Sequence, residues 1–494
     1  MTVAAHEIEL KFLCDPADLD RVLAAAPAGE DEVKDLTSTY FDTPDRDLRK
    51  AGASLRVREG GGKRVQTVKR GEGMTREEHE TTLNGEGLDA STPPLDQILS
   101  RAERHALRPA FEVKVHRRQR LIRHHGAQIE IAVDQGEIRG QDRTHAITEV
   151  ELELKSGGAE ALFDLARALG RSAPLYLSFE GKASQGEALL DGATLAARRG
   201  DKGKMKPTAT TGQAFQTIAR NTLVQIAANA QVLRQVRRPE AVHQLRVAAR
   251  RLRSALATFR AVVEDDRFEG LKAELKWLAD SAGEARDLDV FLAETFAPAL
   301  AADPARRGLA ALGETLEQAR SGAHARIAAA VASARFRELV LEAAAWAETG
   351  AWLTRTDTAR ERPARAFAAQ ALTRRRRKLL KRSRDLAALD DAARHKVRIE
   401  AKKLRYAADA FAPLFDAKAA DRFLKPLKAL QDDLGQLNDA ATAERLVGRL
   451  ALDAPAAFAA GRLAGERAAR KPALVRAAAK ALRQLEDADG FWSR

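Results

Sequence analysis

The sequence contains little cysteine and few aromatic residues. Its 494 residues include a single cysteine, Cys14, which excludes an intrachain disulfide and a zinc site built on several cysteines. Phe, Trp and Tyr make up only 5% of the residues, so the side chains that stack on nucleic-acid bases are scarce. No apolar run reaches the roughly 18 residues of a membrane-spanning helix, and no secretory signal is visible at the N-terminus. We therefore expect a cytoplasmic protein that does not enter a membrane.

The charge balance is the first positive feature of the sequence. With 83 Lys and Arg against 70 Asp and Glu, the formal net charge is +13. A basic balance of this size predicts a polyanionic partner: nucleic acid, an anionic membrane surface or a phosphate polymer. A basic protein with no such partner is the alternative, and net charge alone does not decide between them. The length exceeds that of one ordinary domain, so we expect at least two.

The organisation of the chain changes near its middle. Over residues 1–195 several segments, such as Glu7–Phe12 and 129–134, alternate charged and apolar residues. Successive side chains of a strand point to opposite faces, so such segments predict strands with one charged and one apolar face. Residues 196–212 are polar and rich in Gly, Lys and Thr, which is typical of a linker. Over 213–494 apolar residues recur three and four apart, which predicts helices and makes the whole an α+β multidomain chain.

Acidic and basic residues gather on separate charged strand faces. If the sheet closes with these faces inward, carboxylates line one side of a lumen and Arg or Lys the other. Carboxylate oxygens suit Mg²⁺, and Arg and Lys bind phosphate oxygens, so this lumen would bind a divalent cation and a phosphate chain together. The alternative is that these faces are simply solvated on the outside of the sheet. The residues that share faces are Glu7 with Glu9 and Lys11, Glu130 with Asp134, Arg56 with Arg58, and Glu149 with Glu151 and Glu153.

This half of the sequence resembles the CYTH superfamily, the triphosphate tunnel metalloenzymes. The resemblance covers residues 1 to about 195 and rests on the order and spacing of short motifs: ExExK at 7–11, YFDTP at 40–44, LRVR at 55–58 and ExExE at 149–153. It implies an N-terminal antiparallel eight-stranded β-tunnel that holds Mg²⁺ or Mn²⁺. It also implies hydrolysis of a triphosphate, with inorganic triphosphate as the first expectation.

The resemblance also implies roles for the charged residues of the tunnel. Arg118 is an alternative to Arg117 as the inward residue, because Val113 and Val115 share the strand parity of Arg117. Glu78 and Glu80 are further acidic candidates. The implied metal ligands are Glu7, Glu9, Glu130, Asp134, Glu151 and Glu153. The implied catalytic residues are Glu7, Glu9, Lys11, Arg56, Arg58, Lys69, Arg117 and Lys182.

Two segments of the second half repeat one pattern of basic residues. In each, a His is followed by basic residues three, seven, eight and ten positions further on, and the similarity spreads over about 45 residues. This predicts an internal duplication, with repeats near 213–350 and 365–494. On a helix these residues form a basic stripe, for which a merely solvated face is the alternative. The stripe residues are His243, Arg246, Arg250, Arg251 and Arg253 in the first copy, and His395, Arg398, Lys402, Lys403 and Arg405 in the second.

The duplicated pattern resembles the CHAD family, the conserved histidine α-helical domain, over residues of about 213–494. The resemblance implies a C-terminal all-α helical bundle whose basic surface binds inorganic polyphosphate, and it assigns both stripes to that surface. Base-stacking aromatics are nearly missing from the two segments, so nucleic acid is disfavoured. In the second copy Asn438-Asp439 stands where the first has Arg286-Asp287, so the two halves need not bind equally.

The two halves together predict one ligand chemistry. We expect metal-dependent hydrolysis of inorganic triphosphate, or of a related triphosphate, in the β-tunnel and polyphosphate binding by the helical domain. Association with polyphosphate granules is a further expectation. The alternative is a non-catalytic, granule-associated protein that binds polyphosphate. The oligomeric state and the preferred metal stay open at this point.

Overall fold

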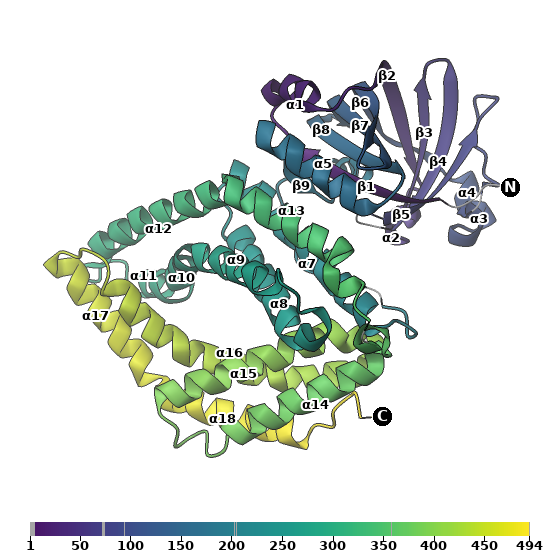
Figure 1. Ribbon diagram of the computed structural model, residues 1–494. Helices are drawn as coiled ribbons and strands as arrows, with labels where there is room; N and C mark the ends of the chain where they lie inside the picture. The colour runs from purple at the N-terminus through teal and green to yellow at the C-terminus, as the bar shows by residue number, and fades with distance from the viewer. Residues whose placement is uncertain are drawn as a thin grey trace. The chain divides into compact units, whose positions relative to one another are not determined.

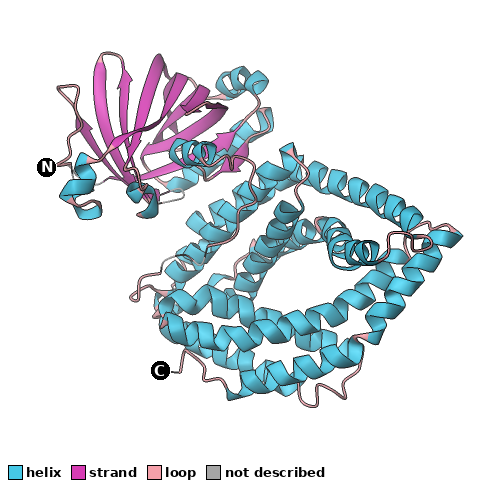
Figure 2. Ribbon diagram, turned by 180° about the vertical axis from the view of Figure 1, so that it is seen from behind, coloured by secondary structure: helices cyan, strands magenta, loops and turns pink. Residues whose placement is uncertain are grey.

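The chain folds into two compact units. The computed structural model describes residues 5–71, 75–92, 94–201, 203, 205–356 and 358–493, without the side chains of 5–7, 75–76 and 440–441. Internal contacts group Met1–Ala196 with Val340–Thr349, and Ala197–Leu339 with Gly350–Arg494. The strands lie in the first unit, and the second is built from helices (Figures 1 and 2).

The first unit is built around one antiparallel sheet of nine strands. Its strand order is β5-β4-β3-β2-β6-β7-β8-β1-β9. The strands are β1 (Ala5–Leu13), β2 (Glu30–Asp42), β3 (Ala53–Gly60), β4 (Lys63–Arg70), β5 (Thr75–Thr82), β6 (Arg108–His124), β7 (Ala127–Gly140), β8 (Arg143–Ser156) and β9 (Tyr176–Ser178). The helices of this unit are α1 (Leu19–Ala25), α2 (Asp47–Lys50), α3 (Leu95–Ile98), α4 (Arg101–His105), α5 (Ala159–Ser172) and α6 (Lys182–Leu190).

Strand β1 joins the two ends of this sheet. One edge of β1 pairs with β8 over residues 8–13. The other edge is shared, because residues 5–8 pair with β5 and residues 11–13 pair with β9. Strands β1 to β8 therefore make a ring of pairings that is joined at β5 through four residue pairs. The predicted antiparallel sheet is confirmed, with nine strands instead of eight because the short β9 occupies the remaining edge of β1.

Helices cover the apolar face of the alternating strands. Leu10 and Ile131 on the strands are fully buried, and α5 contacts both β7 and β8. Along α5 the buried residues Leu162, Leu165 and Leu169 recur three and four apart, the spacing of a helix that buries one face. Because this covered face is the outer one, the charged residues that alternate with Leu10 and Ile131, such as Glu9 and Glu130, lie on the inward face.

Part of the inward face is apolar, and this part carries α6. Tyr40 of β2 stacks on Phe111 of β6 with ring centroids 4.6 Å apart. These rings pack with Val113, Ile147 and Leu189 in one buried cluster, and Leu189 comes from α6. The apolar cluster therefore anchors α6 against the sheet, which brings Lys182 at the first turn of this helix to the charged part of the inward face.

The second unit is all-helical, as predicted. The two copies of the basic pattern lie on α8 and α15, and the buried faces of these helices include Leu245 and Leu404. None of the helices in the described ranges is both long and apolar enough to cross a bilayer. The helices beyond α6 are α7 (Thr211–Gln235), α8 (Pro239–Val263), α9 (Phe268–Ser281), α10 (Gly283–Phe291), α11 (Ala297–Ala302), α12 (Leu309–Ala332), α13 (Ala334–Thr349), α14 (Ala364–Arg382), α15 (Asp391–Phe411), α16 (Ala417–Val447), α17 (Ala454–Ala469) and α18 (Lys471–Asp487).

Candidate functional site

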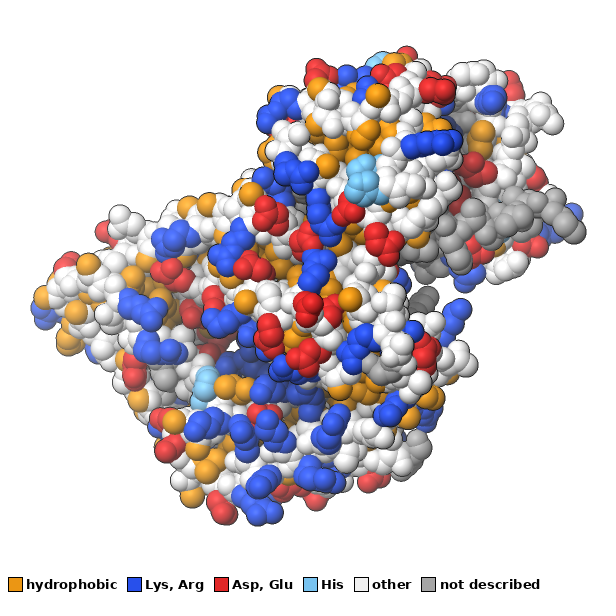
Figure 3. All heavy atoms as spheres, in the orientation of Figure 1, with side chains coloured by type: hydrophobic (Ala, Val, Ile, Leu, Met, Phe, Trp, Pro, Cys, Tyr) orange, Lys and Arg blue, Asp and Glu red, His pale blue; other side chains and the backbone are white. Residues whose placement is uncertain are grey.

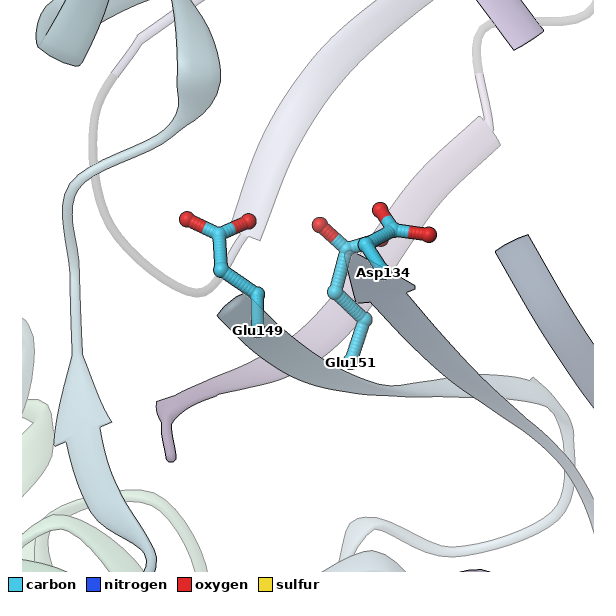
Figure 4. A group of neighbouring side chains, drawn as sticks. All are labelled: Asp134, Glu149 and Glu151. Atoms are coloured by element: carbon cyan, nitrogen blue, oxygen red, sulfur yellow. The ribbon is translucent and has the colours of Figure 1, made fainter. Parts of the chain in front are cut away.

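Three carboxylates meet on the inward face of the sheet. Asp134 lies on β7, and Glu149 and Glu151 lie two residues apart on β8 (Figure 4). One carboxylate oxygen from each lies within 4.8 Å of the others. Asp134 and Glu149 are 0% exposed. We refer to these three residues as the acidic trio; so many buried charges require compensation by cations.

Three cations supply this compensation. Lys182 Nζ lies 2.8 Å from a carboxylate oxygen of each member of the trio. Arg117 donates from Nε and Nη2 to Asp134 at 2.7 and 2.6 Å, and from Nη2 to Glu151 at 2.5 Å. Lys11 donates to Glu151 and lies 3.4 Å from Glu149. Three negative charges are therefore matched by three positive ones.

This balance of charges holds the acidic trio and its three cations in their charged forms. Burial alone would raise the pKa of Glu151, but Lys11, Lys182 and Arg117 hold the pKa of this carboxyl well below its usual range. Burial opposes the charge of Lys182 in the same way, and the trio raises the pKa of this lysine well above its usual range. Gln185 of α6 adds a hydrogen bond to Glu149.

A second group of cations lies on β3 and β4. Lys69 Nζ is 2.7 Å from Glu78, and Arg56 Nη2 is 3.7 Å from the same carboxylate. The Arg56 Nε is buried and has no hydrogen-bond partner among the described residues. Burial would raise the pKa of the Tyr40 hydroxyl, but Arg56, with Lys182 and Lys69, lowers it. Tyr40 therefore places its hydroxyl among the cations of both groups.

Arg58 differs from the other cations. Among the described side chains, none of the carboxylates lies within ion-pair distance of its guanidinium. The neighbouring Arg56, burial and Arg117 lower the pKa of Arg58 to about 10. A buried cation that is repelled by its neighbours is stabilised by an added anion.

A row of acids crosses three strands beside the trio. Glu153 of β8 is the direct partner of Glu9 on β1 and of Glu130 on β7. Like charges directly opposite each other on neighbouring strands repel. Lys155 relieves part of this repulsion, at 2.6 Å from Glu153 and 3.6 Å from Glu130. Glu9 lies 3.6 Å from Lys11. This row, the acidic row, is less fully compensated than the trio.

The structure brings together most of the residues that the sequence predicts. Lys11, Arg117, Lys182, Asp134 and Glu151 form one ion-paired cluster. The alternative residue Arg118 points away from it and donates to Asp20 at 2.7 Å. Glu80 accepts a hydrogen bond from Thr67 at 3.2 Å. The side chain of Glu7 lies outside the described residues. Sequence reasoning omitted Glu149, Gln185 and Tyr40 from the site, although Glu149 shares the strand parity of Glu151.

On the helical unit, cations of the two repeats face each other. Lys402 on α15 is 8% exposed. Its pKa is lowered to about 6 by burial and then by Arg250, Arg398 and Arg246. Arg246 pairs with Asp287 at 3.2 Å, and Arg398 lies 3.8 Å from Asp439. Basic side chains gather around the hollow of this unit and along α14 and α15 (Figure 3). Arg246, Arg250, Arg398 and Lys402 form the basic cluster of this unit.

The two histidines that begin the stripes have different neighbours. His395 Nδ1 lies 2.6 Å from Asn438 Oδ1. His243 has Arg286 at the position of this asparagine in the other repeat. Burial lowers the pKa of His243, and Arg286 lowers it further. The two halves of the helical unit therefore differ at this position.

The remaining stripe residues lie apart from the basic cluster. Arg251 lines a small cavity with Ser254 and Tyr406, between α8 and α15. The Arg253 Nε is buried and lacks a hydrogen-bond partner among the described residues. Lys403 forms an ion pair with Glu400 at 3.2 Å, and Arg405 lies 3.9 Å from the carboxylate of Asp409.

Comparison with known families identifies both units. A family model described as the CYTH domain matches residues 5–186, and one described as the CHAD domain matches residues 217–448. The charged inward face lies within the first match, and both basic stripes lie within the second. The chain therefore joins a CYTH domain to a CHAD domain.

Similar proteins are known for each part. An inorganic triphosphatase from Haemophilus influenzae is 30% identical over 197 residues, which is 37% of this chain and 55% of that protein. The crystal structure of the CHAD domain from the plant Ricinus communis is 33% identical, with a TM-score of 0.52, and covers 58% of this chain and 96% of that one. PptA from Streptomyces chartreusis is 22% identical, with a TM-score of 0.42, and covers 56% of this chain and 100% of that one.

Proposed function

We propose that the CYTH domain hydrolyses a phosphoanhydride bond of inorganic triphosphate on its charged inward face, and that the CHAD domain binds inorganic polyphosphate. The observation that carries the first part is the set of buried or half-buried cations that converge there: Lys11, Arg58, Arg117 and Lys182. Cations fixed inside a site stabilise the charge that develops on phosphoryl oxygens during transfer. The name of the H. influenzae relative agrees with this substrate.

The cations have different tasks in this proposal. Arg58 binds a phosphate oxygen without first leaving a carboxylate. Lys11, Arg117 and Lys182 exchange carboxylate for phosphate oxygens, and the planar guanidinium of Arg117 suits two of them at once. Arg56 and Lys69, which both pair with Glu78, bind the end of the triphosphate that is farther from Arg117 and Lys182. Substrate is thus held at several phosphoryl groups, which selects a triphosphate over a single phosphate.

The charge balance favours a divalent cation at the acidic row over the trio, whereas the carboxylate oxygens that lie within 4.8 Å of one another among the described residues are those of the trio. The trio is balanced by three cations, so an ion bound there has to displace an ammonium or guanidinium group. The row of Glu9, Glu130 and Glu153 offers carboxylate oxygens, which Mg²⁺ and Mn²⁺ prefer, with less compensation. These three residues would therefore hold the metal. A bound divalent ion lowers the pKa of its water and polarises a phosphoryl oxygen.

The second part of the proposal rests on the basic cluster. Four cations from α8 and α15 face one another, and the carboxylates nearest to them, Asp287 and Asp439, lie at 3.2 and 3.8 Å. Burial lowers the pKa values of Lys402 and Arg398, and the neighbouring arginines lower them further. An extended polyanion would relieve this mutual repulsion. Because the cluster has few aromatic neighbours, it suits a phosphate polymer better than nucleic acid.

Phosphate release from inorganic triphosphate, with Mg²⁺ or Mn²⁺, tests the first part. Removing one preorganised donor typically slows turnover about 100-fold or more, so Arg58→Met is expected to do so. Arg118→Met is the matched control, because Arg118 is on the same domain and pairs with Asp20 instead. If the two variants retain the same rate, Arg58 does not bind the reacting phosphate. Retained activity after chelation of divalent ions would contradict the metal assignment.

A further inference from the structure

The segment between the domains is packed onto the helical unit. The sequence predicts a linker over residues 196–212, and residues from Ala197 onward group with the second unit. Asn229 of α7 is fully buried. Its Nδ2 donates to the carbonyl of Arg198 at 2.9 Å, and the Arg198 N–H donates back to its Oδ1 at 3.1 Å. These two hydrogen bonds fix the backbone of the segment at Arg198.

At Gly200 the backbone of the segment also lies close to the helical unit. A Cβ atom at this position would collide with the guanidinium of Arg251 and would lie 2.5 Å from the side-chain oxygen of Gln225. The absence of a side chain therefore lets the backbone lie directly on α7 and α8. The arginine between these two anchored positions, Arg199, is held beside α8 as a result.

Arg199 lies beside α8 about one helical turn before His243, where the first basic stripe begins. Its Nε is 3.6 Å from Glu240 of α8, and its side chain is 83% exposed. Glu240, His243 and Arg246 are three residues apart in turn, so they follow one another along one face of the helix. Arg199 therefore adds a cation at the start of this face. Its charge, like those of Arg286 and Arg246, contributes to the lowered pKa of His243, after burial.

The other repeat has a different arrangement at this place. There His395 contacts the neutral Asn438, which stands where the first repeat has Arg286. The start of α8 thus has Arg286 and Arg199 around its histidine, in addition to the stripe that both repeats share.

We propose that residues 197–201 complete an anion-binding subsite at the start of α8, in which Arg199 and Arg286 flank His243 and lengthen the basic stripe by one turn. The inference rests on the proposed polyphosphate binding and names where the polymer continues beyond the basic cluster. The ligand of this subsite is a phosphoryl group of the same polyphosphate molecule that the basic cluster binds. The segment between the domains is therefore part of the binding surface as well as a connection.

The test measures the affinity of the full-length protein for long-chain polyphosphate over a range of salt concentrations. Arg199→Ala is expected to weaken binding several-fold and to reduce the slope of log K against log salt by roughly one, as for the loss of one phosphate contact. Lys276→Ala is the matched control, since Lys276 is exposed and pairs with Asp280 at 2.6 Å, its single carboxylate partner in the described part of the chain. It should leave both quantities unchanged.

The outcomes separate this inference from the function on which it rests. If the wild-type protein does not bind polyphosphate, the proposed function of the CHAD domain fails and the subsite with it. If the wild type binds but Arg199→Ala matches Lys276→Ala, only the subsite is overturned. Asn229→Ala, which removes no charge, should weaken binding by releasing the segment. Unchanged affinity in this variant, with intact helical content by circular dichroism, would overturn the role of the packed segment.

Discussion

Replacing Lys402 by methionine is predicted to stabilise the free protein while weakening its affinity for polyanions. Lys402 is buried, and the groups that face it are Arg250 and Arg246 of α8, Arg398 of α15 and Asp439 of α16. Burial and then the three arginines lower the pKa of this lysine from 10.5 to about 6, against a smaller opposing effect of Asp439. The folded protein therefore accommodates the charged lysine poorly unless an anion is bound.

The lowered pKa fixes the sign and the magnitude of the effect. Between about pH 6 and pH 10.5 the unfolded chain binds a proton at Lys402 that the folded chain does not, so this group makes stability rise with pH. At pH 7 the difference corresponds to about 3.5 pKa units, which sets a ceiling of about 5 kcal/mol on the stability that Lys402 removes. Methionine keeps the length of the apolar stem, so we expect a gain of at least ~1 kcal/mol, or about 2 °C in Tm.

Chemical denaturation at pH 7 and pH 9 provides the assay. Lys403→Met is the control, because Lys403 supports the buried Glu400 together with Lys378 and Arg382, and its loss should destabilise slightly. The advantage of Lys402→Met should shrink at pH 9, and the variant should bind polyphosphate more weakly than the wild type. A variant that is less stable than the wild type at pH 7, or whose advantage grows with pH, would refute the reasoning.

Two further predictions concern the two sites separately. Glu149→Gln removes one charge from a fully buried group shared by Lys11 and Lys182, so urea denaturation should show a loss of about 3 kcal/mol; an unchanged midpoint would contradict the charge balance of the trio. A combined replacement in the helical stripes should abolish polyphosphate binding and spare triphosphate hydrolysis, and an equal fall in both would contradict separate roles for the domains. The replaced residues are His243, Arg246, Arg398 and Arg405.

Strand alternation was sufficient to predict which residues of the first domain share a strand face. The period of two is a local property, so the shared face of Lys11 with Glu9, and of Glu151 with Glu149, follows from the sequence alone. The partner of each residue across the sheet depends on strand register, which is a tertiary property. For this reason the pairing of Glu153 with both Glu9 and Glu130 was not predictable.

The contacts that uncharged residues make in the site also could not be predicted from the sequence. Gln185 carries no charge and no motif, and it reaches Glu149 only because an apolar cluster anchors α6. Tyr40 belongs to a motif noted in the sequence, but its place beside Arg56 depends on how β2 and β3 pair.

Helical spacing was sufficient to predict the basic stripes, but not the surroundings of each stripe residue. A spacing of three and four identifies the face of a helix, but not what covers that face. Arg251 adjoins Arg250 in the sequence, yet it lies about 100° away around α8, where Gly200 of the packed segment approaches it. The burial of Lys402 likewise depends on the packing of α15 against other helices, α8 among them, which helical spacing alone does not predict.

Phosphate release by the intact protein tests the central claim most directly. Inorganic triphosphate, ATP, thiamine triphosphate and long-chain polyphosphate would be compared side by side with Mg²⁺ or Mn²⁺, for the wild type and for Glu9→Ala. The proposed function predicts a clear preference for inorganic triphosphate that is lost without divalent ions and in the variant, whose thermal stability should stay unchanged. No release from any of the four, with polyphosphate still bound, would contradict it and leave a polyphosphate-binding protein whose CYTH domain does not catalyse.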